Sequence, residues 1–514
     1  MKKYQSDSNS GISRRDLFKV SGMMALGGLV LGGLKSNDLA RGATAQPPIG
    51  TDLDSTQQYS YFDQLDEFYP GEPLDPNEMR ITFLGSSDPP PRLAQSMMSI
   101  FVEVGNGQGE PDQFIFDCGS GVVGRYNAAK ITFARMDKIF LTHLHGDHMS
   151  DLTHIYCFGP SVDRKSPLYV WGSGPSRVKS PMPPRRLYDD GTKAYCENLR
   201  AALRWHTESF SFQPTSYESY KDKAPTRSSW GLPCDPVPVG DDGPTDGFAL
   251  IPIELDWTKY GKVPGDNVAY HNEASGVTIT HFPVIHCRKG SIGYKLEWNG
   301  LSMIYSGDTK PEYHSINQAK NGGNSVDVFI HEMVPPAEVW ALKTLGITDP
   351  SEVPQALWEA AVNASLQVQN SSHTSQGAFG YLLTLIDPRP RLAVATHFPA
   401  EDDTVNSALE SVRNHCPGIV QGIPSGVPDP AGNITWSFDL TVINVSAVDH
   451  SIRERKAVVS PFTFGGTPVQ YPDVNTPKYH TADGSMDPYA QIDRSMEVPA
   501  YDSDGNMNYN PNGY

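Results

Sequence analysis

The chain has few cysteines, few hydrophobic residues and no long hydrophobic run. Its six cysteines are too scattered over 514 residues to form a disulfide framework, although one or two bridges would suit an oxidising compartment. Hydrophobic residues make up only 38% of the chain, against 46 glycines and 43 prolines. This composition argues against a mainly helical protein and favours a loop-rich globular one.

Basic side chains are also in deficit. The chain has 41 Lys and Arg against 59 Asp and Glu, a formal net charge of −18. Because nucleic-acid backbones attract Lys and Arg, so acidic a chain is a poor general binder of nucleic acid. Nucleic acid is therefore disfavoured as a partner, although a local basic patch is not excluded.

The N-terminus reads as a targeting segment over residues 1–45. Residues 13–19 (SRRDLFK) resemble the twin-arginine export signal, and residues 43–45 (ATA) fit a cleavage site. The Gly-rich apolar stretch 21–34 between them is too short and weak for a transmembrane helix. We therefore expect the twin-arginine translocation machinery as a partner, no stable membrane span after cleavage, and a periplasmic or secreted bacterial protein.

One short segment concentrates metal-binding side chains. His143, His145, Asp147 and His148 lie within six residues, directly after an apolar run that predicts a buried strand. Imidazole suits zinc and related transition metals, and the carboxylate adds an anionic ligand. The alternative is a polar loop with clustered histidines, but this density favours a metal site at a strand end.

Three more ligand-type residues each follow a β-like run. They are His286 after 277–285, Asp308 after 301–304 and His397 after 392–396. In this order, and behind the His-x-His-x-Asp-His pattern, they resemble the metallo-β-lactamase superfamily. The resemblance implies an α/β fold, the αββα sandwich of that superfamily.

The same resemblance implies a centre of two divalent metal ions. The implied ligands are His143, His145 and His286 for one ion, Asp147, His148 and His397 for the other, and Asp308 as the bridge. Zinc is the first expectation, while manganese and iron also accept mixed histidine and carboxylate ligands. Such a site lowers the pKa of a water molecule and neutralises charge on a phosphoryl or sulfuryl group.

Later motifs resemble the ribonuclease Z-like branch. They include SGDTKP around Asp308, DVFIHE at 327–332 and SHTS around His373. The tRNA-binding arm of that branch lies between the third ligand and the bridging Asp, but here His286 and Asp308 are only 22 positions apart. The spacing fits a simple hairpin, so we expect an arm-less relative similar to zinc-dependent arylsulfatases and phosphodiesterases.

Two residues are candidates for catalytic roles beyond metal binding. By resemblance, His373 would protonate the leaving group, a task that suits imidazole at neutral pH. The alternative is a loop that caps a helix beginning at Gln376. Asp147 could also orient the attacking water. His331 and Glu332 would orient ligands or His373, or form an ordinary pair at a strand end.

The pattern along the chain predicts four segments. After the signal, residues 46–78 form an extended lead-in, and residues 79–440 form the catalytic domain. Within it, residues from about 160 to 246 are rich in Pro, Gly and Ser and read as an insertion. Residues 441–514 read as an irregular C-terminal tail.

The sequence therefore predicts an exported, metal-dependent hydrolase that cleaves a small sulfate or phosphate ester. The main alternative is a secreted ribonuclease Z-like nuclease or phosphodiesterase. A lactonase and a non-catalytic binding protein rank lower, the latter because all seven ligand positions are occupied. A homodimer is an expectation from the resembling branch alone.

Overall fold

The computed structural model describes residues 59–106, 111–211, 246–262, 265–375, 377–423 and 432–461. The chain divides into two compact units, Met1–Leu203 with Val237–Pro461, and Arg204–Pro236 with Phe462–Tyr514. Of the second unit the structure describes α8 (Arg204–Ser211) alone. The expected signal segment, most of the lead-in and the chain beyond 461 lie outside the described residues.

Two mixed β-sheets form the first unit. In spatial order, the first sheet contains β1 (Asp66–Phe68), β17 (Ile452–Ala457), β16 (Thr441–Ser446), β2 (Glu78–Gly85), β3 (Ser99–Val104), β4 (Asp112–Phe116), β5 (Lys138–Phe140), β6 (Leu168–Ser173) and β7 (Leu250–Leu255). The second contains β14 (Val420–Gln421), β15 (Asn433–Trp436), β13 (Leu392–Thr396), β12 (Val328–Glu332), β11 (Leu301–Tyr305), β10 (Ile292–Trp298), β9 (Val277–Pro283) and β8 (Val268–Asn272).

The main core lies between the two sheets and follows the period of two in each strand. Met79, Ile81 and Phe83 of β2 join one buried cluster with Val328 and Ile330 of β12. The alternate residues of the same strands face outward into separate clusters beneath the helices. Successive side chains of a strand point to opposite faces, so both faces of each sheet must be covered.

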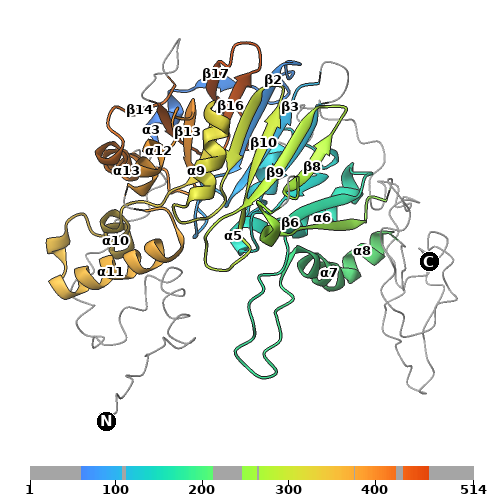
Figure 1. Cartoon of the computed structure of the whole chain (residues 1–514), viewed down its shortest axis with the longest axis horizontal. Coiled ribbons are helices and arrows are strands. Elements are labelled where there is room, and N and C mark those ends of the chain that lie inside the picture. Colours follow the sequence, from blue (N-terminus) through green and yellow to red (C-terminus); the bar gives the residue numbers. More distant parts are fainter. Residues whose placement is uncertain are drawn as a thin grey trace, which may run out of the picture. The chain divides into compact units, whose positions relative to one another are not determined.

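Helices supply that cover on both outer faces (Figure 1). The first sheet packs against α4 (Val122–Ala128), α6 (Leu152–Val162) and α7 (Thr192–Ala202), and the second against α9 (Tyr313–Lys320), α12 (Ala378–Thr384) and α13 (Asp402–His415). The remaining helices are α3 (Ser60–Asp63), α5 (Gly146–Met149), α10 (Ala337–Leu345) and α11 (Gln355–Ser372), with short 3₁₀ turns at Phe133–Arg135, Trp257–Lys259, Asn321–Gly323 and Pro350–Glu352. The predicted α/β sandwich of two sheets between helical layers is confirmed.

The sheets extend beyond the boundaries expected from the sequence. Strand β6 lies within the expected insertion, yet it pairs with β5 and β7. Strands β16 and β17 lie within the expected tail, and β16 pairs with β2. The reason is their apolar alternation, since Ile443 and Val445 enter the core between the sheets while Val442 faces the outer cluster.

Two further sequence expectations concern cysteines and membrane spans. The five cysteines within the described ranges are Cys118, Cys157, Cys196, Cys287 and Cys416, and all have free thiols. Among the helices that the structure describes, none combines the length and the apolar character needed to cross a bilayer.

Candidate metal centre

The first sheet positions the His-x-His-x-Asp-His motif at the end of β5. His143 lies three positions after the end of the strand, and His145 precedes the short helix α5, which carries Asp147 and His148. Strand β4 runs parallel to β5, so the residue after it, Asp117, lies at the same edge of the sheet. Side chains that follow parallel strands therefore converge at one edge.

The second sheet contributes ligand-type residues from three strand ends. His286 follows β9, Asp308 follows β11 and His397 follows β13. His397 has a left-handed φ of 56°, an uncommon conformation for a residue with a side chain. Gly307, beside Asp308, has a φ of 58°, and a Cβ there would lie 2.6 Å from Cβ of Thr142. A side chain at this position would separate the loops of the two sheets.

Three histidines form one group. His143, His145 and His286 each offer a nitrogen, and these nitrogens lie within 4.8 Å of one another. Nε2 of His286 is 3.1 Å from Nδ1 of His145. The ring centroids of His143 and His145 are 4.5 Å apart. Three imidazoles at this spacing match a nitrogen site for zinc or a related metal.

Two carboxylates and two histidines form the second group, Asp147, His148, Asp308 and His397, again within 4.8 Å. Nε2 of His397 lies 3.2 Å from Oδ2 of Asp147. Nε2 of His148 lies 3.5 Å from the same oxygen and 3.1 Å from Oδ1 of Asp308. This group has mixed oxygen and nitrogen ligands.

Asp308 lies between the two groups. Its Oδ2 is 3.9 Å from Nε2 of His143, 3.8 Å from Nε2 of His286 and 3.5 Å from Nε2 of His397. The structure therefore brings all seven sequence-predicted ligand residues together, with Asp308 where a bridging carboxylate would stand. Their role as ligands stays a prediction.

The buried atoms of this cluster fit divalent cations. Nε2 of His143 is buried without a hydrogen-bond partner, and Nε2 of His148 and Oδ1 of Asp308 are buried facing each other at 3.1 Å. Such atoms cost free energy unless something pairs with them. Burial lowers the pKa of His143, and it lowers that of His145 to about 4. Both imidazoles are thus neutral at pH 7, the state that a metal ligand needs.

Asp117, which was not among the residues predicted from the sequence, holds His148 on the side of the ring away from Asp308. Its Oδ2 accepts hydrogen bonds of 2.8 Å from Nδ1 of His148, from the Thr142 hydroxyl and from the Tyr305 hydroxyl. Its Oδ1 accepts from the Thr142 backbone nitrogen at 2.8 Å. The available signal was its place after the β-like run 114–116, the rule that located Asp308.

A second supporting contact fixes His286. Nδ1 of His286 donates to the carbonyl oxygen of Ser372 at 2.9 Å, which directs Nε2 toward the cluster. Ser372 is the last residue of α11, so this helix holds both His286 and the next residue, His373, against the centre.

His373 is paired with Glu332, as one of the two sequence interpretations expected. Nδ1 of His373 lies 3.0 Å from both carboxylate oxygens of Glu332, and the ring centroids of His373 and His286 are 5.0 Å apart. Burial opposes protonation of His373, but the Glu332 carboxylate outweighs it and raises the pKa of His373 to about 9. His331, the other residue of that expected pair, instead stacks against Phe379 at 5.3 Å.

A cavity of about 380 Å³ opens beside the three-histidine group. His143, His145 and His286 line one part of it, while Arg288 and Lys289 line another. The cavity also reaches the segment between β6 and α7, through Ser176, Asp189 and Asp190. A substrate of moderate size would thus contact the metal-binding histidines and cationic side chains together.

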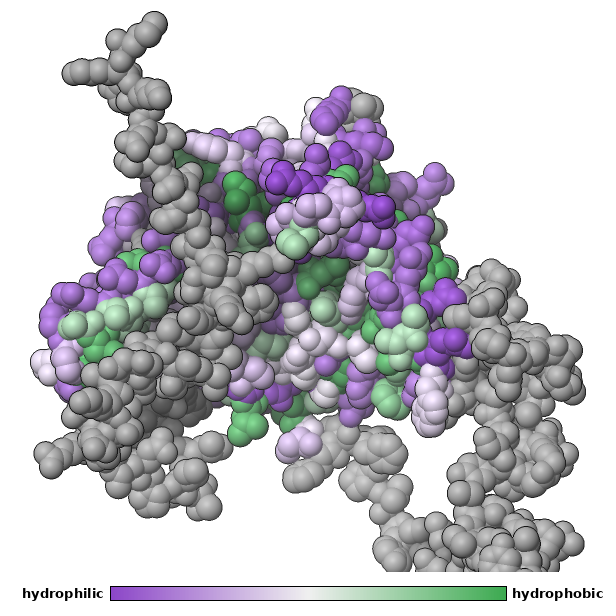
Figure 2. All heavy atoms as spheres, turned by 90° about the horizontal axis from the view of Figure 1, so that it is seen from below, coloured by the Kyte–Doolittle hydropathy of each residue, from purple (hydrophilic) through white to green (hydrophobic). Residues whose placement is uncertain are grey.

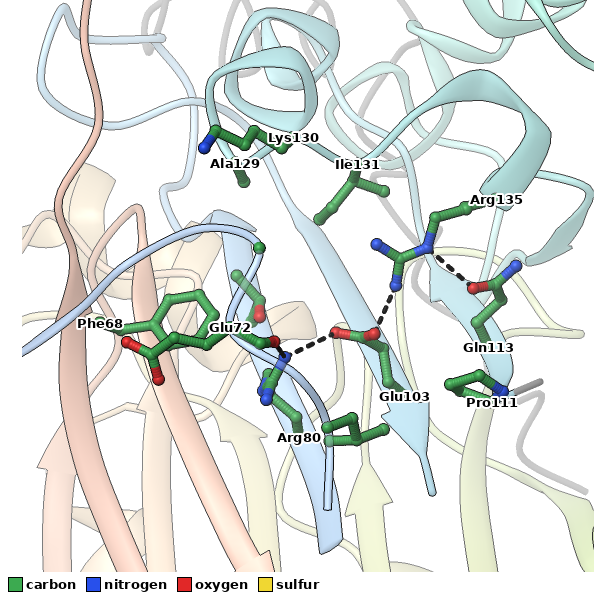
Figure 3. Close-up of a pocket in the computed structure, with 13 residues that line it drawn as sticks. Phe68, Glu72, Arg80, Glu103, Pro111, Gln113, Ala129, Lys130, Ile131 and Arg135 are labelled. Atoms are coloured by element: carbon green, nitrogen blue, oxygen red, sulfur yellow. Dashed lines mark hydrogen bonds and ion pairs between the residues drawn. The ribbon is translucent and has the colours of Figure 1, made fainter. Parts of the chain in front are cut away.

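Another cavity of about 380 Å³ lies at the opposite end of the first sheet (Figure 3). Three of its charged residues pair with one another, because Glu103 contacts Arg80 at 3.7 Å and also contacts Arg135. Nε of Arg135 donates to Oε1 of Gln113 at 3.0 Å. The charges of Arg80, Glu103 and Arg135 are thus partly balanced within the cavity.

Comparison with known proteins gives relatives of low identity. No family model matches the chain. Ribonuclease BN of Proteus mirabilis is 25% identical over 263 residues, which are 49% of this chain and 76% of the relative. Ribonuclease Z of Archaeoglobus fulgidus is 23% identical over 321 residues, which are 58% and 89%.

Solved structures give weaker likenesses. The metallo-β-lactamase fold protein YhfI from Bacillus subtilis has a TM-score of 0.41 and 12% identity, over 71% of this chain and 99% of that chain. The short form of human tRNase Z has a TM-score of 0.35 and 17% identity, over 71% and 98%. The chain is thus similar to ribonucleases Z and BN at low identity, and its layered architecture agrees with the expected metallo-β-lactamase fold.

Proposed function

We propose that the protein is a metal-dependent phosphodiesterase that acts on RNA. The observation that carries the proposal is the cluster of seven ligand-type side chains around Asp308, in a chain whose curated relatives are ribonucleases over about half its length. These relatives agree with the predicted enzyme class, a metal-dependent hydrolase. They favour the nuclease alternative over hydrolysis of a small sulfate or phosphate ester. They also favour nucleic acid as a substrate, contrary to the expectation from the net charge.

The residues present fit two divalent ions, with zinc as the first expectation because of the histidine-rich ligands. His143, His145 and His286 would hold one ion, and Asp147, His148 and His397 the other, with Asp308 shared. Ions bound there would lower the pKa of a water molecule and neutralise charge on the phosphate.

The protein's own side chains then orient the centre and move protons. Asp117 and the Ser372 carbonyl fix the tautomers of His148 and His286, so that each presents Nε2 to the cluster. Glu332 accepts the Nδ1 proton of His373, which leaves Nε2 of His373 to deliver a proton to the leaving oxygen. Asp147, which lies 3.2 Å from His397, would orient the attacking water.

The test is hydrolysis by the purified, metal-loaded protein. We would assay a tRNA precursor with a 3′ trailer, bis(4-nitrophenyl) phosphate, 4-nitrophenyl phosphate and 4-nitrophenyl sulfate, beside a His145→Ala variant. Cleavage of the RNA and of the phosphodiester, lost in the variant, would support the proposal. Turnover of the sulfate ester alone would restore the arylsulfatase-like reading, and no turnover of any diester would refute the proposed function.

We also propose export through the twin-arginine pathway, on the strength of the SRRDLFK pattern alone, since residues 13–19 lie outside the described residues. Cell fractionation tests it with an Arg14→Lys/Arg15→Lys variant. The unaltered protein should be found in the periplasm or medium, and the variant should stay in the cytoplasm. Equal distribution of the two would refute export by this route.

A further inference from the structure

A hairpin projects from the first unit between β6 and α7 (Figure 1). We call residues 176–190 the basic hairpin. Its two arms are joined by backbone hydrogen bonds, from Ser180 nitrogen to Arg186 oxygen at 2.8 Å and from Tyr188 nitrogen to Val178 oxygen at 2.9 Å. From the sequence, this stretch was predicted only as part of the Pro-, Gly- and Ser-rich insertion.

The hairpin carries a concentrated positive charge. Residues 177–187 contain Arg177, Lys179, Arg185 and Arg186 and no acidic residue, in a chain with a net charge of −18. All four side chains are exposed. Arg177 lies 3.6 Å from Asp256, whereas Lys179, Arg185 and Arg186 form no ion pair with any residue that the structure describes. Unpaired cations at the tip of a projecting element are available to bind an anionic partner.

The base of the hairpin is fixed to the loop that carries His286. The Asp190 carboxylate accepts from Ser176, at 2.9 Å from its nitrogen and 2.7 Å from its hydroxyl. The same carboxylate pairs with Arg288 at 2.6 Å, and the Arg288 guanidinium lies 4.8 Å from the ring centre of Tyr188. Arg288 is two residues past His286, so the hairpin has a defined position relative to the metal centre.

One continuous cavity links this base to the candidate metal site. The cavity of about 380 Å³ is lined by His143, His145 and His286, and also by Ser176 and Asp190 at the base of the hairpin. A polyanion held along the hairpin would therefore lead directly to the residues that are proposed to cleave it.

The charge of the hairpin favours a polyanion as its partner. Figure 2 views the molecule from below, the side toward which the hairpin projects in Figure 1, and shows hydrophilic residues interspersed with separate hydrophobic patches. On the hairpin itself Met182 and Leu187 are exposed near the four cations. Arg can also stack on exposed bases, which suits RNA. We infer that the basic hairpin binds the phosphate backbone of RNA and guides it to the metal centre; this inference rests on the proposed function.

Binding of RNA at varied salt tests the inference. The variant Lys179→Gln/Arg185→Gln/Arg186→Gln removes three charges without touching the metal centre. The probe is a fluorescein-labelled tRNA precursor with a 3′ trailer, and its Kd is measured by anisotropy between about 50 and 200 mM salt. We expect the variant to bind about tenfold or more weakly and the slope of log K against log salt to become shallower by about 2 to 3. Its turnover of bis(4-nitrophenyl) phosphate should not change.

A matched control removes three cations elsewhere, with Lys130→Gln/Lys320→Gln/Arg413→Gln. The inference would be overturned if the hairpin variant bound RNA with the same affinity and salt slope as the unaltered protein. It would also be overturned if the control variant lost as much RNA affinity as the hairpin variant. A hairpin variant that loses binding to phosphatidylserine vesicles while its RNA binding is unchanged would overturn it as well. RNA bound through the hairpin but never cleaved would refute the proposed function and support the binding surface. Failure of the one proposal is thereby separable from failure of the other.

Discussion

Asp117 and His148 are joined by a hydrogen bond of 2.8 Å between Oδ2 and Nδ1, and both side chains are fully buried. The bond fixes the tautomer of His148 and directs its Nε2 toward Asp308, 3.1 Å away. A carboxylate behind a ligating histidine typically matters almost as much as the ligand itself.

Replacement of this carboxylate should weaken metal binding. We expect Asp117→Asn to reduce the affinity for zinc by about 10- to 100-fold, measured by competition with a chromophoric chelator. Asp112→Asn is the matched control, because Asp112 is a buried carboxylate at the other end of β4 and bonds with Tyr270 and Asn272 instead. An equal loss of affinity in both variants would show that the effect is general destabilisation.

The number of metal ions bound per chain should distinguish Asp308, the proposed bridging ligand, from His145, a proposed ligand of one ion only. Asp308 lies within 3.9 Å of nitrogens from both groups, whereas His145 belongs to the three-histidine group alone. We expect His145→Ala to retain about one ion per chain and Asp308→Ala to retain well under one, against about two in the unaltered protein. Elemental analysis after gel filtration measures this ratio. Retention of two ions by Asp308→Ala would exclude the bridging position.

Glu332 should act through the proton on His373. Without the Glu332 charge the pKa of His373 should fall from about 9 toward its ordinary value. The alkaline limb of the pH–activity profile of Glu332→Gln should therefore shift to lower pH. We expect kcat on RNA to fall by about 10- to 100-fold at pH 8. KM should change little, because Glu332 faces His373 and the backbone nitrogen of Thr309.

Two substrates with different leaving groups test whether Glu332 acts through the proton on His373. A 4-nitrophenolate leaves without a proton, so bis(4-nitrophenyl) phosphate should be cleaved almost normally by Glu332→Gln, whereas an RNA alkoxide needs the acid. Glu338→Gln, an exposed substitution at the start of α10, serves as control. If Glu332→Gln lost both activities equally, with an unshifted pH profile, the pairing would be merely structural.

The candidate ligands were predictable because the His-x-His-x-Asp-His pattern is local and because the resemblance implied the order of the later ligands. His286, Asp308 and His397 each follow an apolar β-like run, so they could be located without knowledge of the partner strand. Asp117 obeys the same rule, but its role depends on the pairing of β4 with β5, a contact between residues that lie 24 positions apart in the sequence. Its function is therefore visible only after folding.

The fold was predictable where strands are central and less so at its margins. Strands β16 and β17 come after more than 400 residues and still pair beside β2, a long-range contact that no local pattern specifies. The basic hairpin escaped prediction because its Pro and Arg content resembles an irregular loop. The hairpin of β10 and β11 between His286 and Asp308, by contrast, followed from the short spacing and is confirmed.

Glu454 should make stability depend on pH. This carboxyl is buried and accepts from the Tyr61 and Thr435 hydroxyls, at 2.7 Å each. Burial raises its pKa from the ordinary 4.5 to about 7. The folded state thus keeps the proton over a range where the unfolded chain has lost it. The stability of the fold is highest below pH 4.5 with respect to this group and falls as the pH rises to 7, by about 3 kcal/mol at most.

The substitution Glu454→Gln keeps the shape of the side chain and removes its ionisable carboxyl group. Relative to the unaltered protein, the variant should therefore gain free energy of unfolding steadily between pH 5 and pH 7 and show a constant advantage above that. Urea denaturation at several pH values measures the difference, which cancels the titration of groups common to both proteins. Glu359→Gln, at an exposed position of α11, should show no such trend. A difference between Glu454→Gln and the unaltered protein that does not change with pH would mean that Glu454 stays ionised in the folded state, with its charge balanced by the two hydroxyl donors.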